Sequence, residues 1–337
     1  MALVLGCDNP SGPPTRVVIP AGVGFRIVAD SLERTGLISQ PRIFSLYAAA
    51  RGRDRHVKPG TYILRRGASW NRILDALAVG RGMVHSVTIP EGWSLSRIAP
   101  QLARVLELPT ESLDVAVRDP ALLRELDIPT PTVEGYLFPE TYLFPVGTSA
   151  RGAVRQMVNE FEKRWKPEWD DRARELAMTR HDVLALAAII ETEARVPEER
   201  PVISAVYHNR LKKGMLLQAD PTVQYALGRH VARVLFRDLA VDSRYNTYRY
   251  KGLPPGPIAS PGTPSIEAAL HPADVPYLYF VAHPDGHHEF RRTFAEHAKA
   301  IAMVKAAARA VRVRAASDSA ARALRPGAAP TGPRTRR

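Results

Sequence analysis

One stretch constrains the fold more than any other: the segment from Thr179 to Ala194, which predicts a buried helix. Thr179 and Asp182, three residues apart, form a capping box that leads directly into an apolar run. The apolar residues recur at helical spacing and cover most of the helix surface: Val183, Leu184, Leu186, Ala187, Ile189, Ile190 and Ala194. Because a helix that is apolar on nearly every side belongs in an interior, we expect a domain core to form around it.

Two carboxyl groups, Glu191 and Glu193, lie in the last two turns of this helix, where an unpaired charge is costly. At about 100° per residue their side chains point roughly 160° to 200° apart, so they cannot both reach one substrate bond. A carboxyl among aliphatic side chains tends to stay protonated and can donate a proton near neutral pH. The alternative is that one or both glutamates cap a neighbouring helix or pair with Arg195 or Arg200.

The chain has 337 residues, enough for two domains with their own cores, and its 45% hydrophobic content is that of a globular protein. The net charge of +13 is mainly C-terminal: from Lys305 onward nine Lys or Arg face one acid, Asp318, a net of +8. Residues 313–337 predict a disordered basic tail that can meet anionic lipid, nucleic acid or another anionic polymer. A solvated tail without a partner is the alternative, so the charge establishes no specific nucleic-acid binding.

The only cysteine is Cys7, which excludes an internal disulfide framework. The residues from Leu3 to Cys7 resemble the end of a bacterial lipoprotein signal, whose cleavage would leave Cys7 to carry a lipid. Six residues precede it, without the charged start and the apolar segment of about 7 to 15 residues that export needs. Either an upstream segment is missing or the match is chance. We interpret residues 1–15 as an anchor remnant and linker, and no run of about 20 apolar residues predicts a transmembrane helix.

The remaining segments mix short strands and helices, which predicts an α+β fold. Within residues 16–89 we expect a small unit of strand, two helices and strand, with a third helix capped by Ser69 before its last strand. Further helices are expected at 94–106 (capped by Ser94), 109–126, 150–177, 198–212 and 265–270 (capped by Ser265), and a strand at 277–282 that begins a hairpin.

Three loops carry candidate binding groups. Residues 133–142 combine aromatics with Glu134, which suits the wall of a sugar-binding cleft, although aromatic clusters are more often core. Residues 217–222 predict a turn rich in hydrogen-bonding side chains. Residues 252–262, rich in Pro and Gly, predict a rigid extended loop with little entropy to lose on binding.

Three imidazoles, those of His283, His287 and His288, flank a predicted hairpin turn at Pro284-Asp285-Gly286. Histidine is a common metal ligand, but no suitably spaced acid or thiol completes a set here. We therefore expect neither a metal site nor a cofactor.

Many motifs, in order over more than 100 residues, resemble the endolytic murein transglycosylases, the MltG or YceG-like family. They include Ile190-Glu191-Thr192-Glu193, Asn209-Arg210-Leu211, Leu217-Gln218, Asp220-Pro221-Thr222-Val223, Tyr245-Asn246-Thr247-Tyr248 and Gly252-Leu253-Pro254-Pro255-Gly256. The likeness extends through Glu134-Gly135 and Lys58-Pro59-Gly60-Thr61-Tyr62 to about residue 16. It implies a LysM-like module over residues 16–89 and a mixed α+β catalytic domain over 90–312. The chain departs from the family pattern at Thr192 and Ala194, where Lys and Thr are expected.

The resemblance implies internal cleavage of peptidoglycan between N-acetylmuramic acid and N-acetylglucosamine without water, leaving 1,6-anhydromuramic ends and limiting the length of nascent strands. By motif position the catalytic acid and base falls on Glu193, and Glu191 is its secondary, more structural neighbour. The lone carboxyl agrees with this chemistry, because a hydrolytic glycosidase usually needs two. The expected substrate contacts, each with a fold-stabilising alternative, are Gln218, Asp220, Thr222, Tyr245, Asn246, Tyr248 and Glu134.

The resemblance also implies a bacterial plasma-membrane location with the catalytic part on the periplasmic or extracytoplasmic side. Peptidoglycan strands are the expected substrate, the membrane is reached through the N-terminal region, and peptidoglycan synthases are candidate partners. Two other functions stay open. One is a glycan-binding scaffold that has lost catalysis, and the other is a lysozyme-type hydrolase.

Overall fold

The computed structural model describes residues 12–229, 231 and 234–307. The chain forms two compact units, the first comprising residues up to Ala188 together with Pro255–Thr263, the second Ile189–Pro254 and the residues from Pro264 onward. Helices and strands occur in both, so the predicted α+β fold is confirmed. The proposed lipid site at Cys7 and the basic tail over 313–337 lie outside the described residues.

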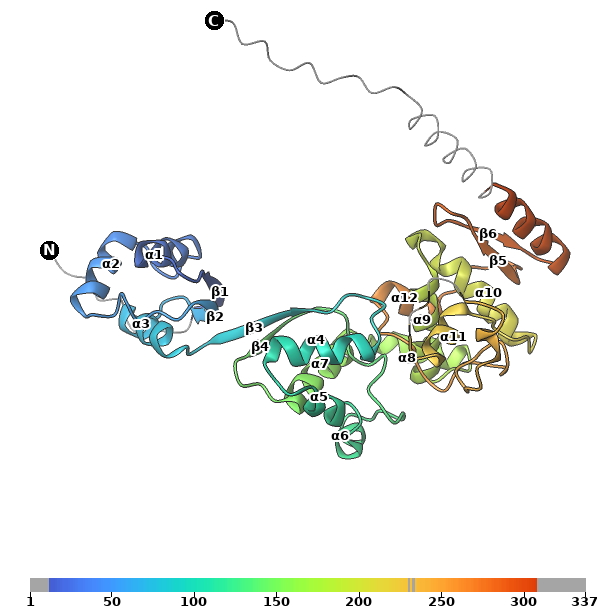
Figure 1. The fold of residues 1–337 in the computed structure, drawn as a ribbon, viewed down its shortest axis with the longest axis horizontal. Coiled ribbons are helices and arrows are strands. Elements are labelled where there is room, and N and C mark those ends of the chain that lie inside the picture. Colours follow the sequence, from blue (N-terminus) through green and yellow to red (C-terminus); the bar gives the residue numbers. More distant parts are fainter. Residues whose placement is uncertain (1–11, 230, 232–233, 308–337) are drawn as a thin grey trace, which may run out of the picture. The chain divides into compact units, whose positions relative to one another are not determined.

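An antiparallel sheet runs through the first unit (Figure 1). Its strands, in order, are β1 (Pro14–Ile19), β2 (Gly60–Arg65), β3 (Met83–Thr88) and β4 (Thr141–Pro145). The β1–β2 and β3–β4 pairs are long, whereas β2 and β3 share only the pairs Thr61↔Val84 and Tyr62↔Met83. The sheet therefore consists of two well-paired ribbons with a short join.

Eight helices of the described residues lie wholly within the first unit. They are α1 (Phe25–Arg34), α2 (Pro41–Ala50), α3 (Trp70–Val79), α4 (Leu95–Leu106), α5 (Thr110–Ala116), α6 (Pro120–Glu125), α7 (Ala150–Arg164) and α8 (Pro167–Glu175). Helices α1 to α3 enclose one hydrophobic core with β1 and β2, centred on Leu32, Phe44 and Tyr62. Ser69 caps α3 as predicted, by accepting a hydrogen bond from the Arg72 backbone. That core lies within residues 16–89, and both the bounds of a separate unit there and its LysM-like character stay predictions.

The aromatic segment differs from its predicted sugar-binding wall, since Tyr136, Phe138 and Tyr142 are only 4–6% exposed. Tyr142 lies in β4, a strand that was not predicted, and its ring stacks on Phe144 with centroids 5.5 Å apart. Alternate residues of a strand point to one face, so these two rings share the buried side of the sheet. The core alternative is the one that the structure supports.

Proline divides two segments that were predicted as single helices. Residues 150–177 form α7 and α8, because Pro167 lacks an amide hydrogen and Lys166 before it is extended, with φ −88° and ψ 138°. Residues 109–126 form α5 and α6, where Asp119 caps the second helix ahead of Pro120.

The second unit is built from short helices and one hairpin. Its elements are α9 (Arg180–Glu193), which begins in the first unit, the 3-10 turns η1 (Pro197–Glu199) and η2 (Asp238–Ala240), α10 (Arg200–Lys212), α11 (Asp220–Ala226), α12 (Thr263–Leu270), and the hairpin β5 (Tyr279–Ala282) and β6 (His288–Arg291). A last helical stretch covers 294–307. Strand β5 packs against α10. Across the described part of the chain, no helix is both long and apolar enough to span a bilayer.

Two predicted details of this unit are wrong. Residues 217–222 were expected to form a turn, but Asp220 begins α11, with Pro221 in the first turn where proline is well tolerated. Ser265 was expected to cap the next helix, yet α12 already begins at Thr263, and the Ser265 hydroxyl instead accepts a hydrogen bond from Arg200.

The buried helix that the sequence predicted is α9. The Thr179 amide donates to the Asp182 carboxylate at 2.9 Å and the Asp182 amide donates back to the Thr179 hydroxyl at 3.1 Å, which is the capping box. Every residue from Val183 to Ile190 is at most 1% exposed. The helix therefore enters the core along its whole apolar run.

The N-terminus of α4 is capped from far along the chain, because Glu134 accepts the Leu95 amide at 2.9 and 3.1 Å from its two carboxylate oxygens. Glu134 is 5% exposed. Ser94 occupies the cap position but its side chain makes no capping bond, so its predicted capping role is wrong. A carboxylate at a helix N-terminus also interacts favourably with the helix dipole, and Glu134 thus has the fold-stabilising role that was the alternative to lining a cleft.

We expect Glu134→Ala to lower the free energy of unfolding by about 1–3 kcal/mol, because it removes a charged acceptor and leaves a buried amide unsatisfied. Ser94→Ala is the matched control and should change it by less than about 0.5 kcal/mol. Urea denaturation followed by circular dichroism measures both variants. Equal effects would contradict the assignment of the cap to Glu134.

Candidate functional site

The candidate site is centred on Glu193, the last residue of α9. The hydroxyl of Tyr207, on α10, donates a hydrogen bond to Glu193 Oε1 at 3.2 Å. Tyr207 is 1% exposed and its ring meets Phe280 of β5 edge to face, with centroids 5.9 Å apart. Burial and this ring contact fix the tyrosine, and the tyrosine in turn holds the carboxyl group.

Burial of the carboxyl group raises the pKa of Glu193 from 4.5 to about 7. The negative charge of Asp220 raises it further, while the Tyr207 hydrogen bond and the charges of Arg195 and Arg210 oppose the rise. Near neutral pH both the acid and the carboxylate are therefore populated. A group in that condition can donate a proton in one step and accept one in the next.

Glu191 lies in a different environment, as its angular separation from Glu193 predicts. Its side chain is 6% exposed, and its Oε1 lies 3.5 Å from the guanidinium of Arg200. Arg200 also donates to Ser265 of α12 at 3.1 Å, so the ion pair is part of the contact between helices. These contacts favour a structural role for Glu191, which was one of the two open alternatives.

Asp220 and Tyr248 lie close enough to Glu193 to interact with it electrostatically. Tyr248 donates its hydroxyl to Asp220 Oδ1 at 2.6 Å. Gln218 precedes them in a left-handed conformation, with φ 53°, where its amide donates to Thr247 and its side-chain oxygen accepts from Arg210. The three predicted contact residues Gln218, Asp220 and Tyr248 are thus held by the network around Glu193.

Two other predicted contact residues, Thr222 and Asn246, are 0% exposed. The Thr222 hydroxyl donates to Ala219 at 2.7 Å and lies 2.8 Å from the Thr247 hydroxyl. The Asn246 amide donates to the carbonyls of Leu239 and Val241 at 2.9 and 2.8 Å. Because these groups are satisfied within the protein, the geometry favours their loop-stabilising alternative.

Tyr245 is only partly buried. Its ring packs on Tyr225 of α11, with centroids 4.7 Å apart. A sugar contact and a packing role both remain compatible with this position.

Sequence reasoning missed Tyr207 and Arg210, the two α10 residues that interact with Glu193. Tyr207 follows Glu193 by fourteen residues, so no local spacing links them. One signal was available, since Tyr207 and Arg210 are three residues apart on a helix whose apolar residues predict burial. An arginine next to a tyrosine on a buried helix was therefore the signal that could have indicated these two residues.

Each of the three imidazoles has an acidic partner, which for His288 is Glu199 of η1, for His283 is Glu289 and for His287 is Asp285. His288 Nδ1 lies 2.6 Å from Glu199, which also accepts the His288 amide, and His283 lies 3.0 Å from Glu289. Among the residues that the structure describes, no three His, Cys, Asp or Glu side chains are grouped to hold a metal ion.

Comparison with known proteins adds independent findings. The model of the YceG-like family matches residues 17–303. The chain is 34% identical to a protein of Bacillus subtilis (strain 168) named endolytic murein transglycosylase, over 87% of this chain and 85% of that protein. A protein of the same name from Streptococcus pneumoniae serotype 2 is 29% identical over 83% of this chain, which spans 56% of its length. A crystal structure of a yceG-like protein from Listeria monocytogenes superposes with a TM-score of 0.60 at 34% identity, covering 86% of this chain and 99% of that one.

The raised pKa of Glu193 predicts how its replacement changes stability with pH. Because the folded-state pKa of about 7 lies above the ordinary 4.5, ionisation destabilises the folded state as pH rises through this window. Glu193→Gln stays neutral. We expect it to match the wild type near pH 4 and to exceed its free energy of unfolding by about 3 kcal/mol at pH 8, at roughly 1.4 kcal/mol per unit.

Glu191→Gln is the matched control for this measurement. It leaves Arg200 without its carboxylate and should be less stable than the wild type at pH 8, the opposite sign. Denaturant unfolding of all three proteins from pH 4 to 8 tests both. If Glu193→Gln gained nothing at high pH, the carboxyl would not be held as described.

Proposed function

Because this chain belongs to the YceG-like family, we propose that it is a peptidoglycan lytic transglycosylase with Glu193 as its acid and base. The observation that carries the proposal is one carboxyl group, positioned by Tyr207, whose pKa of about 7 makes both protonation states accessible. The relatives named endolytic murein transglycosylase support the substrate and reaction class. We further propose endolytic action that limits the length of nascent strands.

The reaction proceeds in two half-steps on the same carboxyl. Protonated Glu193 gives its proton to the glycosidic oxygen as the bond from that oxygen to C1 of N-acetylmuramic acid breaks. The resulting carboxylate then takes the proton of the muramyl 6-hydroxyl, whose oxygen forms a bond to C1 and closes the 1,6-anhydro ring. The acid is restored and no water is consumed, so one protein carboxyl is sufficient.

The second candidate function is that of a hydrolase. It stays open because Asp220 provides a second carboxyl group near Glu193. Glycosidases that hydrolyse their substrate use two carboxyl groups, and Asp220 is a second carboxyl that interacts electrostatically with Glu193. Its Oδ1, however, accepts the Tyr248 hydroxyl at 2.6 Å. That bond favours a supporting role for Asp220 over activation of water.

The two reactions differ in what becomes of water. With un-crosslinked glycan strands in ¹⁸O-labelled water, we expect internal fragments that end in 1,6-anhydromuramic acid and carry no label, by mass spectrometry. Glu193→Gln should lower the rate by at least about 100-fold, as loss of a general acid typically does.

Glu191→Gln is the control and should keep more activity than Glu193→Gln once its folded fraction is taken into account. Labelled reducing ends would establish the hydrolase instead. Retained glycan binding without any cleavage by the wild type would establish the non-catalytic scaffold.

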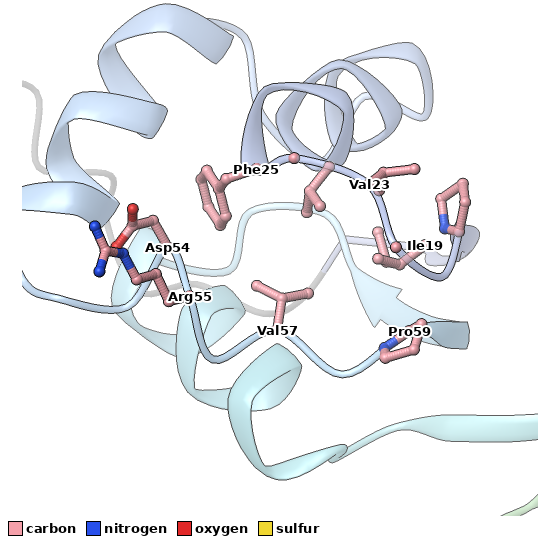
Figure 2. A pocket seen from close by; sticks show the side chains of 11 residues that line it. Ile19, Val23, Phe25, Asp54, Arg55, Val57 and Pro59 are labelled. Carbon is pink, nitrogen blue, oxygen red and sulfur yellow. The ribbon is translucent and has the colours of Figure 1, made fainter.

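The first unit supplies a candidate for a separate glycan contact. A cavity of about 310 Å³ lies between the segment that follows β1 and the segment that precedes β2 (Figure 2). Val23, Phe25 and Val57 give it apolar walls, and Asp54 and Arg55 add charged groups (Figure 2). Apolar walls with a few polar groups suit one ring of a sugar chain. We propose that residues 16–89 are a LysM-like module that uses this cavity to hold the glycan.

Gly24 offers a way to block the cavity without disturbing the fold. It lines the cavity, has an ordinary φ of −69°, and an added Cβ would meet no atom within 4 Å. We expect Gly24→Trp to reduce retention on insoluble peptidoglycan by about tenfold, the equivalent of roughly 1.4 kcal/mol. Leu46→Trp adds the same indole at a position that is 72% exposed and outside the cavity lining. Equal retention of the two variants would remove the cavity from the proposal.

We also propose that the protein acts at the plasma membrane, with its catalytic part on the extracytoplasmic side where peptidoglycan lies. The N-terminal region before residue 16 is the proposed attachment, through Cys7 or an upstream segment. Peptidoglycan synthases are the proposed partners, since they make the nascent strands on which this activity acts.

A further inference from the structure

Arg210 on α10 is a buried cation with an unusual set of partners. It is 7% exposed, and its guanidinium donates to the carbonyls of Leu278 and Leu217 at 2.7 Å each. Longer bonds reach the carbonyl of Leu216 at 3.2 Å and the side chain of Gln218 at 3.4 Å. All of these acceptors are neutral. Among the described residues, no carboxylate lies within ion-pair distance of Arg210.

A buried charge without a counter-charge is costly, and natural proteins usually pair it. Burial accordingly lowers the pKa of the Arg210 guanidinium from its ordinary value. Hydrogen bonds to neutral carbonyls satisfy the donors of this guanidinium, but none of them neutralises its charge. Its position therefore points to another role.

The position is one helical turn beyond Tyr207 on the same face of α10, since residues three apart on a helix are neighbours. Tyr207 donates its hydroxyl to Glu193, and Arg210 interacts electrostatically with both of these groups. Its guanidinium stacks over the Tyr279 ring at 5.1 Å from the centroid, which fixes its orientation. The backbone carbonyls and this ring leave the cation in place whether or not Glu193 is charged.

We propose that Arg210 is a positioning residue that supplies the counter-charge for the Glu193 carboxylate formed midway through the reaction. This inference rests on the proposed role of Glu193 as acid and base. Burial raises the pKa of the Glu193 carboxyl, so without a nearby cation this group would bind its proton too tightly to release it to the glycosidic oxygen. Asp220 acts in the opposite direction, because its negative charge favours the protonated form that begins the reaction.

Few other charged or titratable groups interact with Glu193 and Arg210, so the effect of each on the Glu193 pKa can be tested with its own variant. Glu193 interacts with Tyr207 and Arg210 of α10, Asp220 of α11, and Tyr248 and Arg195 outside those helices. Arg195 carries the same charge as Arg210 and also lowers the Glu193 pKa, although its side chain is solvent-exposed. Arg210 also interacts with His297, whose ring stacks on Tyr279 at 5.2 Å and whose pKa is lowered by burial and by that cation.

The test measures the pKa of Glu193 by carbon NMR in protein labelled at its glutamate carboxyl carbons, with the signal assigned through Glu193→Gln. In Arg210→Met the pKa should rise by on the order of one unit, and in Asp220→Asn it should fall, because Asp220 is the charge that raises it most. Arg210→Met keeps a side chain of similar length but leaves the carbonyls of Leu217 and Leu278 without this donor, so its effect must be compared with that of Arg210→Lys. The Glu193 pKa of the double variant should lie between those of the two single variants.

Two controls separate charge from structure. Arg210→Lys keeps the charge and loses most of the hydrogen bonds, so its Glu193 pKa should stay near that of the wild type. Arg195→Gln removes the other cation that lowers the Glu193 pKa and leaves the hydrogen bonds of Arg210 intact, so a rise of the pKa in this variant reports charge alone. Proton NMR of His297 gives an independent reading, because its pKa should rise in Arg210→Met, where the cation that lowers it is gone.

Activity adds a reading that depends on the reaction. The alkaline limb of the pH profile for kcat/KM should move to higher pH in Arg210→Met and to lower pH in Asp220→Asn, following the pKa of the essential acid. If Arg210→Met and Arg210→Lys shift the Glu193 pKa equally, or if Arg210→Met leaves it unchanged, the inference is overturned. If the NMR shifts occur but Glu193→Gln still cleaves glycan, the electrostatic assignment stands and the proposed function fails.

Discussion

The second unit depends on one requirement, that the carboxyl group of Glu193 be buried without being locked in a single protonation state. Helix α9 achieves the burial, since its residues from Val183 to Ile190 are in the core and carry Glu193 to the end of that run. Helix α10 then offers the Tyr207 hydroxyl, and β5 packs Phe280 behind it. Each neighbouring element contributes either to the position of the carboxyl or to its charge balance.

Local sequence was informative where the physics is local. The capping box at Thr179 and the apolar run after it predicted α9, and the angular separation of Glu191 and Glu193 predicted their different environments. Local sequence was misleading where a residue far along the chain makes the contact. Ser94 has the ideal sequence position for a cap, but a carboxylate from Glu134, forty positions further along, binds the helix N-terminus instead. Nothing in a window of ten residues contains that information.

The candidate site repeats this lesson. Both glutamates of α9 are acids at the end of an apolar helix, and composition does not separate them. Arg200 makes the difference, because it pairs with Glu191 and leaves Glu193 to a tyrosine hydroxyl, which holds a carboxyl without fixing its charge. Tyr207 and Arg210 were missed because their relation to Glu193 exists only once α9 and α10 pack together.

A single carboxyl that works as acid and then as base sets a stricter electrostatic condition than a pair does. In a two-carboxyl glycosidase the pKa values can be pushed apart, so that one group stays protonated and the other ionised. A single carboxyl has only one pKa and must serve in both steps. A strong shift of that pKa in either direction therefore slows one of the two steps. The negative charge of Asp220, which raises the Glu193 pKa, is opposed by the Tyr207 hydrogen bond and by the charges of Arg195 and Arg210, which lower it. Under the proposed mechanism, that balance explains why a buried arginine without a carboxylate partner lies at this position.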